Sequence, residues 1–348
     1  MKAAVLREVA KPLLIEDLEL PSLSNGHILV QMQGAAVCHS QKLEVSGGRG
    51  PDRFLPHLIG HEGVGVVVDI GPGVTKVKSG DQVVLSWIRG SGQVGDPICY
   101  RSLKGRVNAG PIATFCEFPI VSEQCVTRLD PQVNPEIAVL AGCAIPTGAG
   151  TVWNGVPASV RGALCVFGAG GVGLAAVAGA VHAGWEQVVV VDLRQPRLQR
   201  ARDLGATHTV HAGKEDVEEA VAKITRGRGF DLVIECAGAV SAMEMAVRVA
   251  KSNGGRVILI GNLEAGKKIS IDPFDLIQGR WLGGSWGGGI DPDVDIPKIV
   301  RLVEQGALNH RLLSGRKFSL EQVNEAILAL GDEDAGRPII EFSCRAQA

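Results

Sequence analysis

Aromatic residues, long apolar runs and an excess of one charge are all scarce in this sequence. Aromatic side chains account for 4% of the 348 residues, with a single tyrosine. With glycine not counted as apolar, no window holds the roughly 18 consecutive apolar residues of a membrane-spanning helix, so none is expected. The formal net charge of −2 gives no electrostatic reason to expect nucleic acid or an anionic membrane as a partner. The composition is typical of a soluble globular protein, and the length suits two domains.

Secretory features and disulfide patterns are also missing. The opening stretch, "MKAAVLREVAKPLLIEDLEL", carries charges throughout in place of the apolar core of a signal peptide. The cysteines are irregularly spaced, at Cys38, Cys99, Cys116, Cys125, Cys143, Cys165, Cys236 and Cys344. We therefore expect reduced thiols and a cytoplasmic protein.

Glycine, in contrast, is abundant, with 46 residues. Residues 1–145 read as short β-branched runs separated by turns, such as "GVGVVVDI". Residues 160–286 alternate apolar strands with helices, as in a doubly wound parallel sheet. The tail contains two helices and a last strand, "RPIIEF", which suggests a return to the first domain. The pattern predicts an α/β protein with a β-rich domain and a parallel-sheet domain.

A glycine-rich turn, "VFGAGGVG", opens the parallel-sheet region. A predicted strand precedes it and a helix follows, which is the context of a dinucleotide fingerprint. Gly168 makes the tight turn, Gly170 lets backbone N–H groups approach a pyrophosphate, and Gly173 allows close helix packing. The helix N-terminus, near Gly171, adds partial positive charge. A dinucleotide cofactor is therefore predicted.

The next predicted strand, "QVVVVD", ends in Asp192. A carboxylate here accepts hydrogen bonds from the ribose hydroxyls and repels a 2′-phosphate. NAD is therefore favoured over NADP, although Arg194 and Arg197 are near enough in the sequence to moderate the repulsion.

Three potential metal ligands are spread over "AAVCHSQ", "LIGHEGVG" and "AVLAGCAIPTGAG". Each has an ordinary structural explanation, because Cys38 and Cys143 fit buried positions and His61 fits a hydrogen-bonded turn. Together, two thiolates and one imidazole beside a dinucleotide fold match catalytic zinc, which takes three protein ligands and keeps a fourth position open.

These motifs together resemble a zinc-dependent medium-chain alcohol dehydrogenase over almost the whole chain. The resemblance is carried by "VCHS", "GHEGVG", "GDQVV", "GC-x3-TGAG", "GAGGVGL", "VVDL", "ECAG" and "GRPIIEF". It implies a GroES-like β-rich catalytic domain from residues 1–146 and 288–348, and a Rossmann cofactor domain from 147–287. The implied reaction is reversible oxidation of an alcohol to an aldehyde or ketone with NAD.

The resemblance also implies roles for individual residues. Cys38, His61 and Cys143 would bind catalytic zinc, Glu62 would be an acidic neighbour able to join the metal, and Ser40 would relay the alcohol proton. The remaining implied contacts are His39 and Arg337 with the pyrophosphate, Thr147 and Val172 with the nicotinamide, Arg197 with the cofactor, and Trp87 with the substrate. Core filling is the alternative explanation for Trp87.

The sequence departs from the family pattern at several positions. Gln41 stands where many relatives have an aspartate that orients the ligating histidine, and Leu43 replaces a histidine that often ends the proton relay. Many relatives also carry four cysteines for a structural zinc, but here that lobe holds only Cys99 and Cys116. We therefore expect one zinc per chain, and a more mobile lobe held by packing or by a neighbouring subunit.

Other functions remain open on the sequence alone. A dehydrogenase of thiol adducts, of the formaldehyde type, has the same motifs. A zinc-free enoyl or quinone reductase would share the fold but generally lacks the two cysteines and the histidine. A redox-sensing NADH-binding protein would need no zinc. The identity of the alcohol is not encoded in any motif, and relatives form both homodimers and homotetramers.

Overall fold

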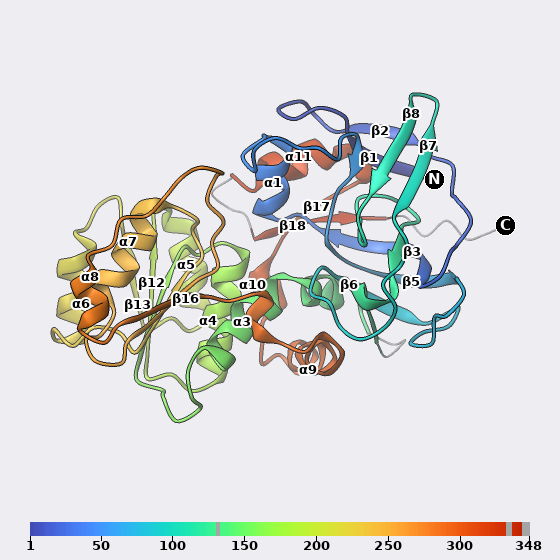
Figure 1. The fold of residues 1–348 in the computed structure, drawn as a ribbon. Coiled ribbons are helices and arrows are strands. Elements are labelled where there is room, and N and C mark those ends of the chain that lie inside the picture. The colour runs from blue at the N-terminus through green and yellow to red at the C-terminus, as the bar shows by residue number, and fades with distance from the viewer. Residues whose placement is uncertain (130–132, 332–335, 343–348) are drawn as a thin grey trace.

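The computed structural model describes residues 1–129, 133–331 and 336–342, which form two bodies side by side (Figure 1). The β-rich body contains two sheets. Its strands are β1 (Lys2–Leu6), β2 (Leu14–Asp17), β3 (His27–Ala36), β4 (His57–Leu58), β5 (Glu62–Ile70), β6 (Gln82–Ser86), β7 (Ile98–Ser102), β8 (Gly105–Ala109), β9 (Ile120–Ser122), β10 (Val126–Arg128), β17 (Ser314–Phe318) and β18 (Arg337–Glu341). Its helices are α1 (His39–Val45), α2 (Pro135–Ala138), α9 (Pro292–Glu304), α10 (His310–Leu313) and α11 (Val323–Ala329).

The β-rich body is assembled from both ends of the chain. Strand β18 pairs antiparallel with β3, with Ile339 opposite Ala36 and Ile340 opposite Ala35. Most apolar side chains of both strands are buried. The last strand of the tail therefore lies in the same sheet as β3, while the predicted domain limits stay a prediction. Two helices depart from the expected all-β texture: α1 begins directly after Cys38, and α2 lies near the end of the region.

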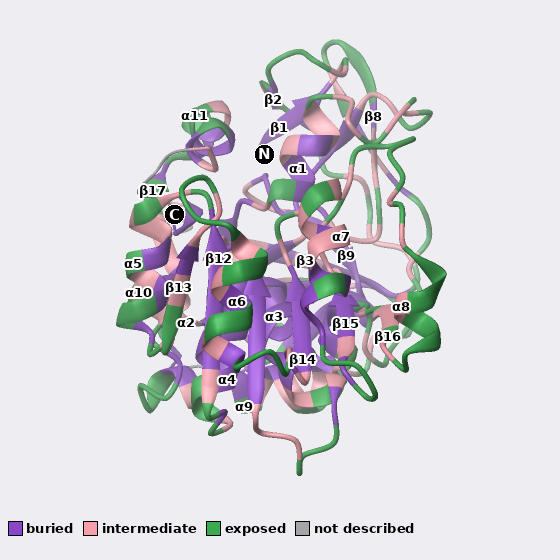
Figure 2. Ribbon diagram, turned by 90° about the vertical axis from the view of Figure 1, so that its left-hand side faces the viewer, coloured by how far each residue is buried: buried purple, intermediate pink, exposed green. Residues whose placement is uncertain are grey.

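The second body is a six-stranded parallel sheet in the order β13-β12-β11-β14-β15-β16. Its strands are β11 (Ala163–Phe167), β12 (Gln187–Asp192), β13 (His208–His211), β14 (Leu232–Glu235), β15 (Arg256–Leu259) and β16 (Trp281–Gly284). Its helices are α4 (Gly171–His182), α5 (Gln195–Asp203), α6 (Val217–Thr225), α7 (Val240–Val249) and α8 (Pro273–Ile277). Figure 2 shows the central strands buried and much of α6 and α8 exposed. This confirms the doubly wound parallel-sheet prediction.

Helix α3 (Ala144–Gly155) joins the two bodies and begins next to Cys143. It packs very closely on α4, because a Cβ on Gly148 would lie 2.2 Å from the Val172 carbonyl oxygen. A Cβ on Gly179 would likewise lie 2.7 Å from the Cα of Ala149. The small residues of both helices are thus required by their contact. The predicted domain limit between residues 146 and 147 falls inside this continuous helix and stays a prediction.

A buried carboxylate organises the lobe between β6 and β9. Glu123 is 1% exposed. One of its oxygens accepts hydrogen bonds from the backbone N–H groups of Thr75 and Lys76, at 2.6 and 2.7 Å, and the other from Gln93 at 2.7 Å. His27 adds a 2.9 Å contact to the Asp96 carbonyl oxygen. The lobe also packs its own apolar side chains, with Ile98, Tyr100 and Val107 buried, so polar contacts act together with the packing that the sequence suggested.

Within the described residues, no single helix is long and apolar enough to cross a membrane, and one bent pair, Pro135–Gly142 with Ala144–Gly155, passes by length and composition. Residues 144–152 of that pair are buried inside the protein. The cysteines in the described part of the chain are free thiols, and Cys344 lies outside that part.

Candidate functional site

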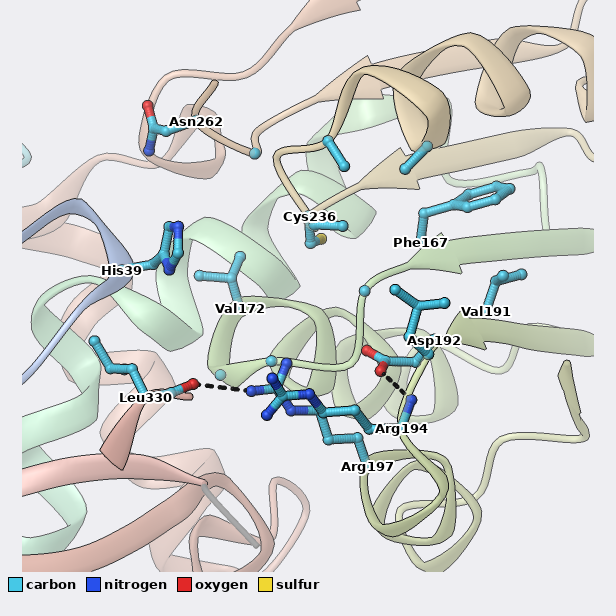
Figure 3. A pocket seen from close by; sticks show the side chains of 18 of the residues that line it. His39, Phe167, Val172, Val191, Asp192, Arg194, Arg197, Cys236, Asn262 and Leu330 are labelled. Carbon is cyan, nitrogen blue, oxygen red and sulfur yellow. Dashed lines mark hydrogen bonds between the residues drawn. The ribbon is translucent and has the colours of Figure 1, made fainter. Parts of the chain in front are cut away.

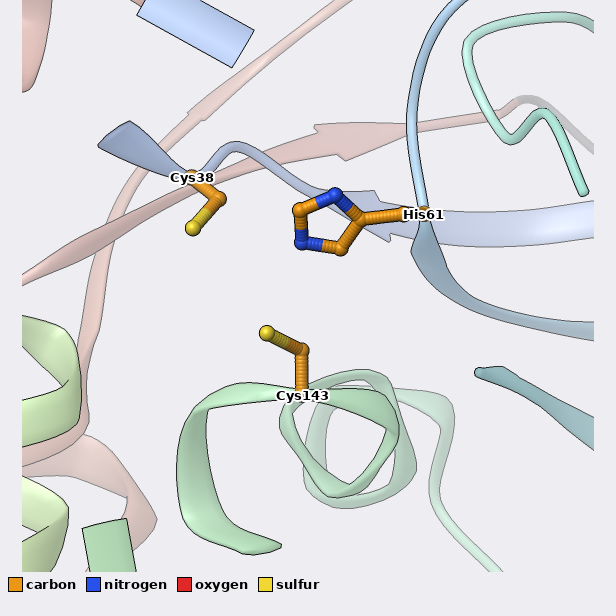
Figure 4. A group of neighbouring side chains, drawn as sticks. All are labelled: Cys38, His61 and Cys143. Atoms are coloured by element: carbon orange, nitrogen blue, oxygen red, sulfur yellow. The ribbon is translucent and has the colours of Figure 1, made fainter. Parts of the chain in front are cut away.

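Cys38, His61 and Cys143 converge where the two bodies meet (Figure 4). Cys38 lies between β3 and α1, His61 immediately precedes β5, and Cys143 precedes α3. Their ligand atoms all lie within 4.8 Å of one another. His61 Nε2 is buried without a hydrogen-bond partner in the described structure. Two thiols and an unpaired imidazole nitrogen are a donor set that suits Zn²⁺.

Charge around this triad favours a thiolate. A hydrogen bond from Cys143 lowers the pKa of Cys38 well below its ordinary value, and the positive charge of Arg337 adds to this effect. The same hydrogen bond raises the pKa of Cys143 well above its ordinary value, so the surroundings favour one thiolate of the pair, the form that binds metal.

Gln41 supports His61 from behind, in the place where the sequence left the second contact in doubt. The Gln41 carbonyl oxygen accepts a hydrogen bond from the Cys38 N–H at 2.8 Å, and its amide nitrogen lies 2.5 Å from His61 Nδ1. Figure 4 shows the other ring nitrogen turned toward the two sulfurs. The glutamine therefore fixes the orientation of the ring as an aspartate would, but without its negative charge.

Glu62 and Arg337 form a buried ion pair behind the triad, at 2.7 Å. The other Glu62 oxygen accepts a hydrogen bond from the Ala144 N–H at 2.8 Å. Burial raises the pKa of Glu62, while the charge of Arg337 opposes that shift. Since both oxygens are engaged, Glu62 is not grouped with the triad in this conformation, and its role at the metal stays a prediction.

A cleft of about 610 Å³ runs from Cys38 and His39 along the carboxyl edge of the parallel sheet (Figure 3). Most of the predicted cofactor residues line it: His39, Gly168, Gly170, Gly171, Val172, Asp192, Arg197 and Arg337, together with Cys38 and Ser40. Thr147 is not among the lining residues, but its hydroxyl is buried and has no partner in the described structure.

The glycine-rich turn has the geometry that its sequence predicted. Gly168 has a φ of +88°, which favours glycine. A Cβ on Gly173 would lie 1.8 Å from the Gly168 carbonyl oxygen, whereas a Cβ on Gly170 would meet nothing within 4 Å. Gly173 is thus needed for packing and Gly170 leaves the approach to the backbone open. Helix α4 starts here without a side-chain cap, so its N–H groups can bind phosphate.

Asp192 forms the far end of the cleft. Its oxygens accept hydrogen bonds from the N–H groups of Ala169, at 2.7 Å, and Arg194, at 2.9 Å. The guanidinium groups of Arg194 and Arg197 donate instead to the carbonyl oxygens of Gly331 and Leu330 in the β-rich body. These two arginines therefore tie the bodies together across the cleft.

Two tryptophan side chains in edge-to-face contact lie against the triad. The ring of Trp87 meets that of His61 edge-on with centroids 6.3 Å apart. Trp286, from the parallel-sheet body, meets Trp87 at 4.8 Å and 84°. Trp286 is nevertheless 80% exposed.

Sequence reasoning missed two contacts in this region. The support that Gln41 gives to His61 is long-range and has no local signal. Glu235, in the quoted motif "ECAG", received no role, yet its side chain is fully buried beside the cleft. A carboxylate that ends an apolar strand at the edge carrying the glycine-rich turn was the available signal.

Two family models match the chain. "Alcohol dehydrogenase GroES-like domain" matches residues 24–131, and "Zinc-binding dehydrogenase" matches residues 171–305. Proteins named S-(hydroxymethyl)glutathione dehydrogenase from Photobacterium damsela subsp. piscicida and from Synechocystis sp. are each 30% identical, over 98% of this chain and 99% of their own length.

Solved structures of alcohol dehydrogenases have the same fold as this chain. An alcohol dehydrogenase zinc-binding domain protein from Burkholderia ambifaria matches with a TM-score of 0.89 at 27% identity, over 98% of both chains. Benzyl alcohol dehydrogenase from Acinetobacter calcoaceticus matches with a TM-score of 0.88 at 25% identity, over 98% of this chain and 99% of its own. Because such relatives align over nearly their entire length, the chain belongs to the zinc-dependent medium-chain dehydrogenase/reductase family, as an oxidoreductase of the alcohol dehydrogenase type that uses NAD.

Proposed function

We propose that Cys38, His61 and Cys143 hold one catalytic zinc, at which an alcohol bearing an apolar, planar substituent is oxidised with NAD. The convergence of the three ligand atoms within 4.8 Å, at the end of the cofactor cleft, carries this proposal. Zinc held by three protein ligands supplies a Lewis acid that lowers the pKa of a bound hydroxyl.

The surrounding residues then have distinct tasks. Ser40 is buried, lines the cleft and has an unpartnered hydroxyl in the described structure, so it can take the alcohol proton. Thr147 and Val172 would contact the nicotinamide half of the cofactor, and His39 and Arg337 its pyrophosphate. Leu43 is buried and cannot carry the proton further, so water or the cofactor ribose would complete its exit.

The proposed class of substrate, an alcohol with an apolar planar group, rests on the edge-to-face pair of Trp87 and Trp286 beside His61. Aromatic faces and edges favour aryl or allylic groups over short alkyl chains. The thiol-adduct alternative is favoured by the names of the 30% identical relatives, and it requires a site for a charged tripeptide. We place the apolar alcohol first because the side chains on the triad are aromatic.

A paired assay tests this function. Benzyl alcohol, cinnamyl alcohol, ethanol and S-(hydroxymethyl)glutathione are compared by kcat/KM with NAD, before and after removal of the metal with a chelator. We expect the aryl alcohols to lead by about tenfold or more, and activity to vanish on chelation and return with Zn²⁺.

Two results would contradict the proposal. Activity that survives complete metal removal would favour a zinc-free reductase or another role for the cleft. A glutathione adduct oxidised far faster than every simple alcohol would replace the proposed substrate class.

Cofactor choice should respond to Asp192. In Asp192→Gly, the repulsion of a 2′-phosphate is removed, which amounts to several kcal/mol at most for charges about 4 Å apart. We expect the ratio of kcat/KM for NAD over NADP to fall at least about tenfold. Asp192→Asn is the matched second variant, because it removes the charge while keeping the acceptor for the Ala169 N–H, at the cost of the acceptor for the Arg194 N–H. An unchanged ratio in both variants would remove Asp192 from this role.

We also infer a homodimer in a reducing, cytoplasmic setting. Strand β16 is an edge of the parallel sheet, and exposed apolar side chains gather on it and on α8: Phe274, Leu276, Ile277 and Trp281. A second copy can cover this edge, and further pairing of dimers would give a homotetramer. Sedimentation equilibrium measures the mass of the assembly, and a monomer at micromolar concentration would contradict the dimer.

The free cysteines in the described residues support a reducing compartment.

A further inference from the structure

A carboxyl group without an assigned task lies beneath the cofactor cleft. Glu235 is the last residue of β14, in register with Phe167 of β11 and Leu259 of β15. Its side chain is 0% exposed. It therefore lies at the carboxyl edge of the sheet, where the turns that line the cleft leave the central strands.

Glu235 contacts two of these turns at once. Its side-chain oxygen Oε1 accepts hydrogen bonds from the N–H groups of Ala237 and Gly238, each at 2.8 Å. Its backbone carbonyl oxygen accepts from Ile260 at 2.9 Å and Gly261 at 3.0 Å. Residues of both turns line the cleft, including Ala237, Ile260 and Gly261. One residue thus fixes two walls of the cofactor site relative to each other.

The turns are packed without spare room. A Cβ on Gly261 would lie 2.5 Å from Glu235 Oε2 and 2.4 Å from the Gly238 nitrogen. A Cβ on Gly168 would lie 2.8 Å from the Ala237 nitrogen. A shift of the turn after Glu235 would therefore press directly on the glycine-rich turn that receives the phosphates.

Keeping this carboxyl group buried is costly. Glu235 Oε2 has no hydrogen-bond partner in the described structure. Burial raises the pKa of the group to about 7, although the N–H donors of the adjoining turns oppose the shift. A carboxyl group with a raised pKa beside a cleft is a candidate for a functional role.

We infer that Glu235 is a positioning residue for the cofactor: its carboxyl group holds the 236–238 turn against the glycine-rich turn, beside the 260–262 turn that its backbone carbonyl binds, and so sets the affinity for the dinucleotide. This inference rests on the proposed role of the cleft as the NAD site. The acceptor atom, rather than the charge, does the work, because the contacts run from backbone N–H groups to Oε1.

Titration of NADH, followed by its fluorescence, tests this role in the wild type, Glu235→Ala and Glu235→Gln. Alanine leaves two buried N–H groups without an acceptor, and we expect Kd to rise about tenfold, equivalent to about 1.4 kcal/mol. Glutamine keeps a carbonyl oxygen for both donors, so its Kd should stay within about threefold of the wild type. Glu123→Ala is the control. Glu123 is also a buried carboxylate that accepts from backbone N–H groups, but neither it nor its donors belong to the cleft.

The outcomes separate this role from general stability and from the proposed function. Wild-type affinity in Glu235→Ala, or an equal loss in the alanine and glutamine variants, would overturn the inference. A similar rise in Kd for Glu123→Ala would also overturn it, because the effect would then follow from loosened folding. If Glu235→Ala does not fold, Glu235→Asp decides, since it keeps the charge but shortens the reach, and an unchanged Kd would contradict the role. A wild type that binds no NADH would instead refute the assignment of the cleft.

Discussion

Cys143→Ala should lose its zinc and its alcohol oxidation together, while NADH binding stays close to that of the wild type. The thiol lies at the start of α3, within 4.8 Å of the other two ligand atoms. Two protein ligands cannot complete a catalytic zinc site that normally uses three. Loss of a supporting residue behind a ligand already costs about 10–100-fold, so we expect at least a 100-fold fall in kcat/KM. Metal analysis should give one zinc per wild-type chain and almost none for the variant.

Two control variants distinguish loss of the zinc ligand from loss of any buried thiol and from loss of proton transfer. Cys165→Ala removes a fully buried thiol from β11, remote from the triad in the parallel sheet, and should keep zinc and activity. Ser40→Ala should retain zinc yet lose about 10²–10⁴ in turnover, the usual worth of a proton-transfer group. A Cys143→Ala protein that still binds one tightly held zinc would refute the ligand assignment. A wild type holding two tight zinc ions would contradict the expectation of a single site.

Glu123→Ala should lower the stability of the protein. The backbone N–H groups of Thr75, Lys76 and Gln93 would lose their acceptor, but these hydrogen bonds are only partly buried and the three residues are exposed or half-exposed. Water can replace part of the lost contacts, so we expect the free energy of unfolding, measured with urea, to fall by about 1–3 kcal/mol. Proteolysis between residues 88 and 97 should become faster as well, because Gln93 anchors that loop.

The same contacts give a pH signature. Burial alone would raise the pKa of Glu123, but the N–H donors of Gln93, Thr75 and Lys76 outweigh it and lower the pKa. A carboxyl group with a depressed folded-state pKa stabilises the protein above its unfolded pKa, about 4.3, and loses that contribution as the pH falls further. The stability gap between wild type and Glu123→Ala should therefore be widest near neutral pH and narrow below about pH 4. Glu304→Ala, at an exposed position, is the control. A gap that is small at pH 7 would rule out the anchoring role.

Local patterns were sufficient to predict much of the fold. The glycine-rich turn, its flanking strand and helix, and Asp192 all lie in one continuous stretch, and their conformation follows from sterics within that stretch. The valines of β12 form a continuous apolar run because a parallel strand in this position is buried on both faces. The triad is different, because its ligands come from three segments and were joined by the family resemblance rather than by any local signal.

The contacts that the sequence could not predict are those that a side chain makes with backbone or side-chain groups far away in the sequence. Gln41 looked like the loss of an orienting group, yet its amide reaches His61 because α1 begins one residue after Cys38. Glu123 and Glu235 bind backbone N–H groups that any residue type can supply. Such an acceptor leaves no mark on the sequence of its donors, so only the folded geometry reveals it.

The pairing of β18 with β3 has a consequence for synthesis on the ribosome. Cys38, His61 and Cys143 all emerge long before residues 337–341. Until that strand arrives, the Ala35–Ala36 edge lacks its neighbour and the buried Glu62 lacks the counter-charge of Arg337. The parallel sheet, continuous in sequence from Ala163 to Gly284, can close in the meantime. A nascent chain therefore carries a nearly finished nucleotide-binding half while its catalytic half waits for the last strand to be translated.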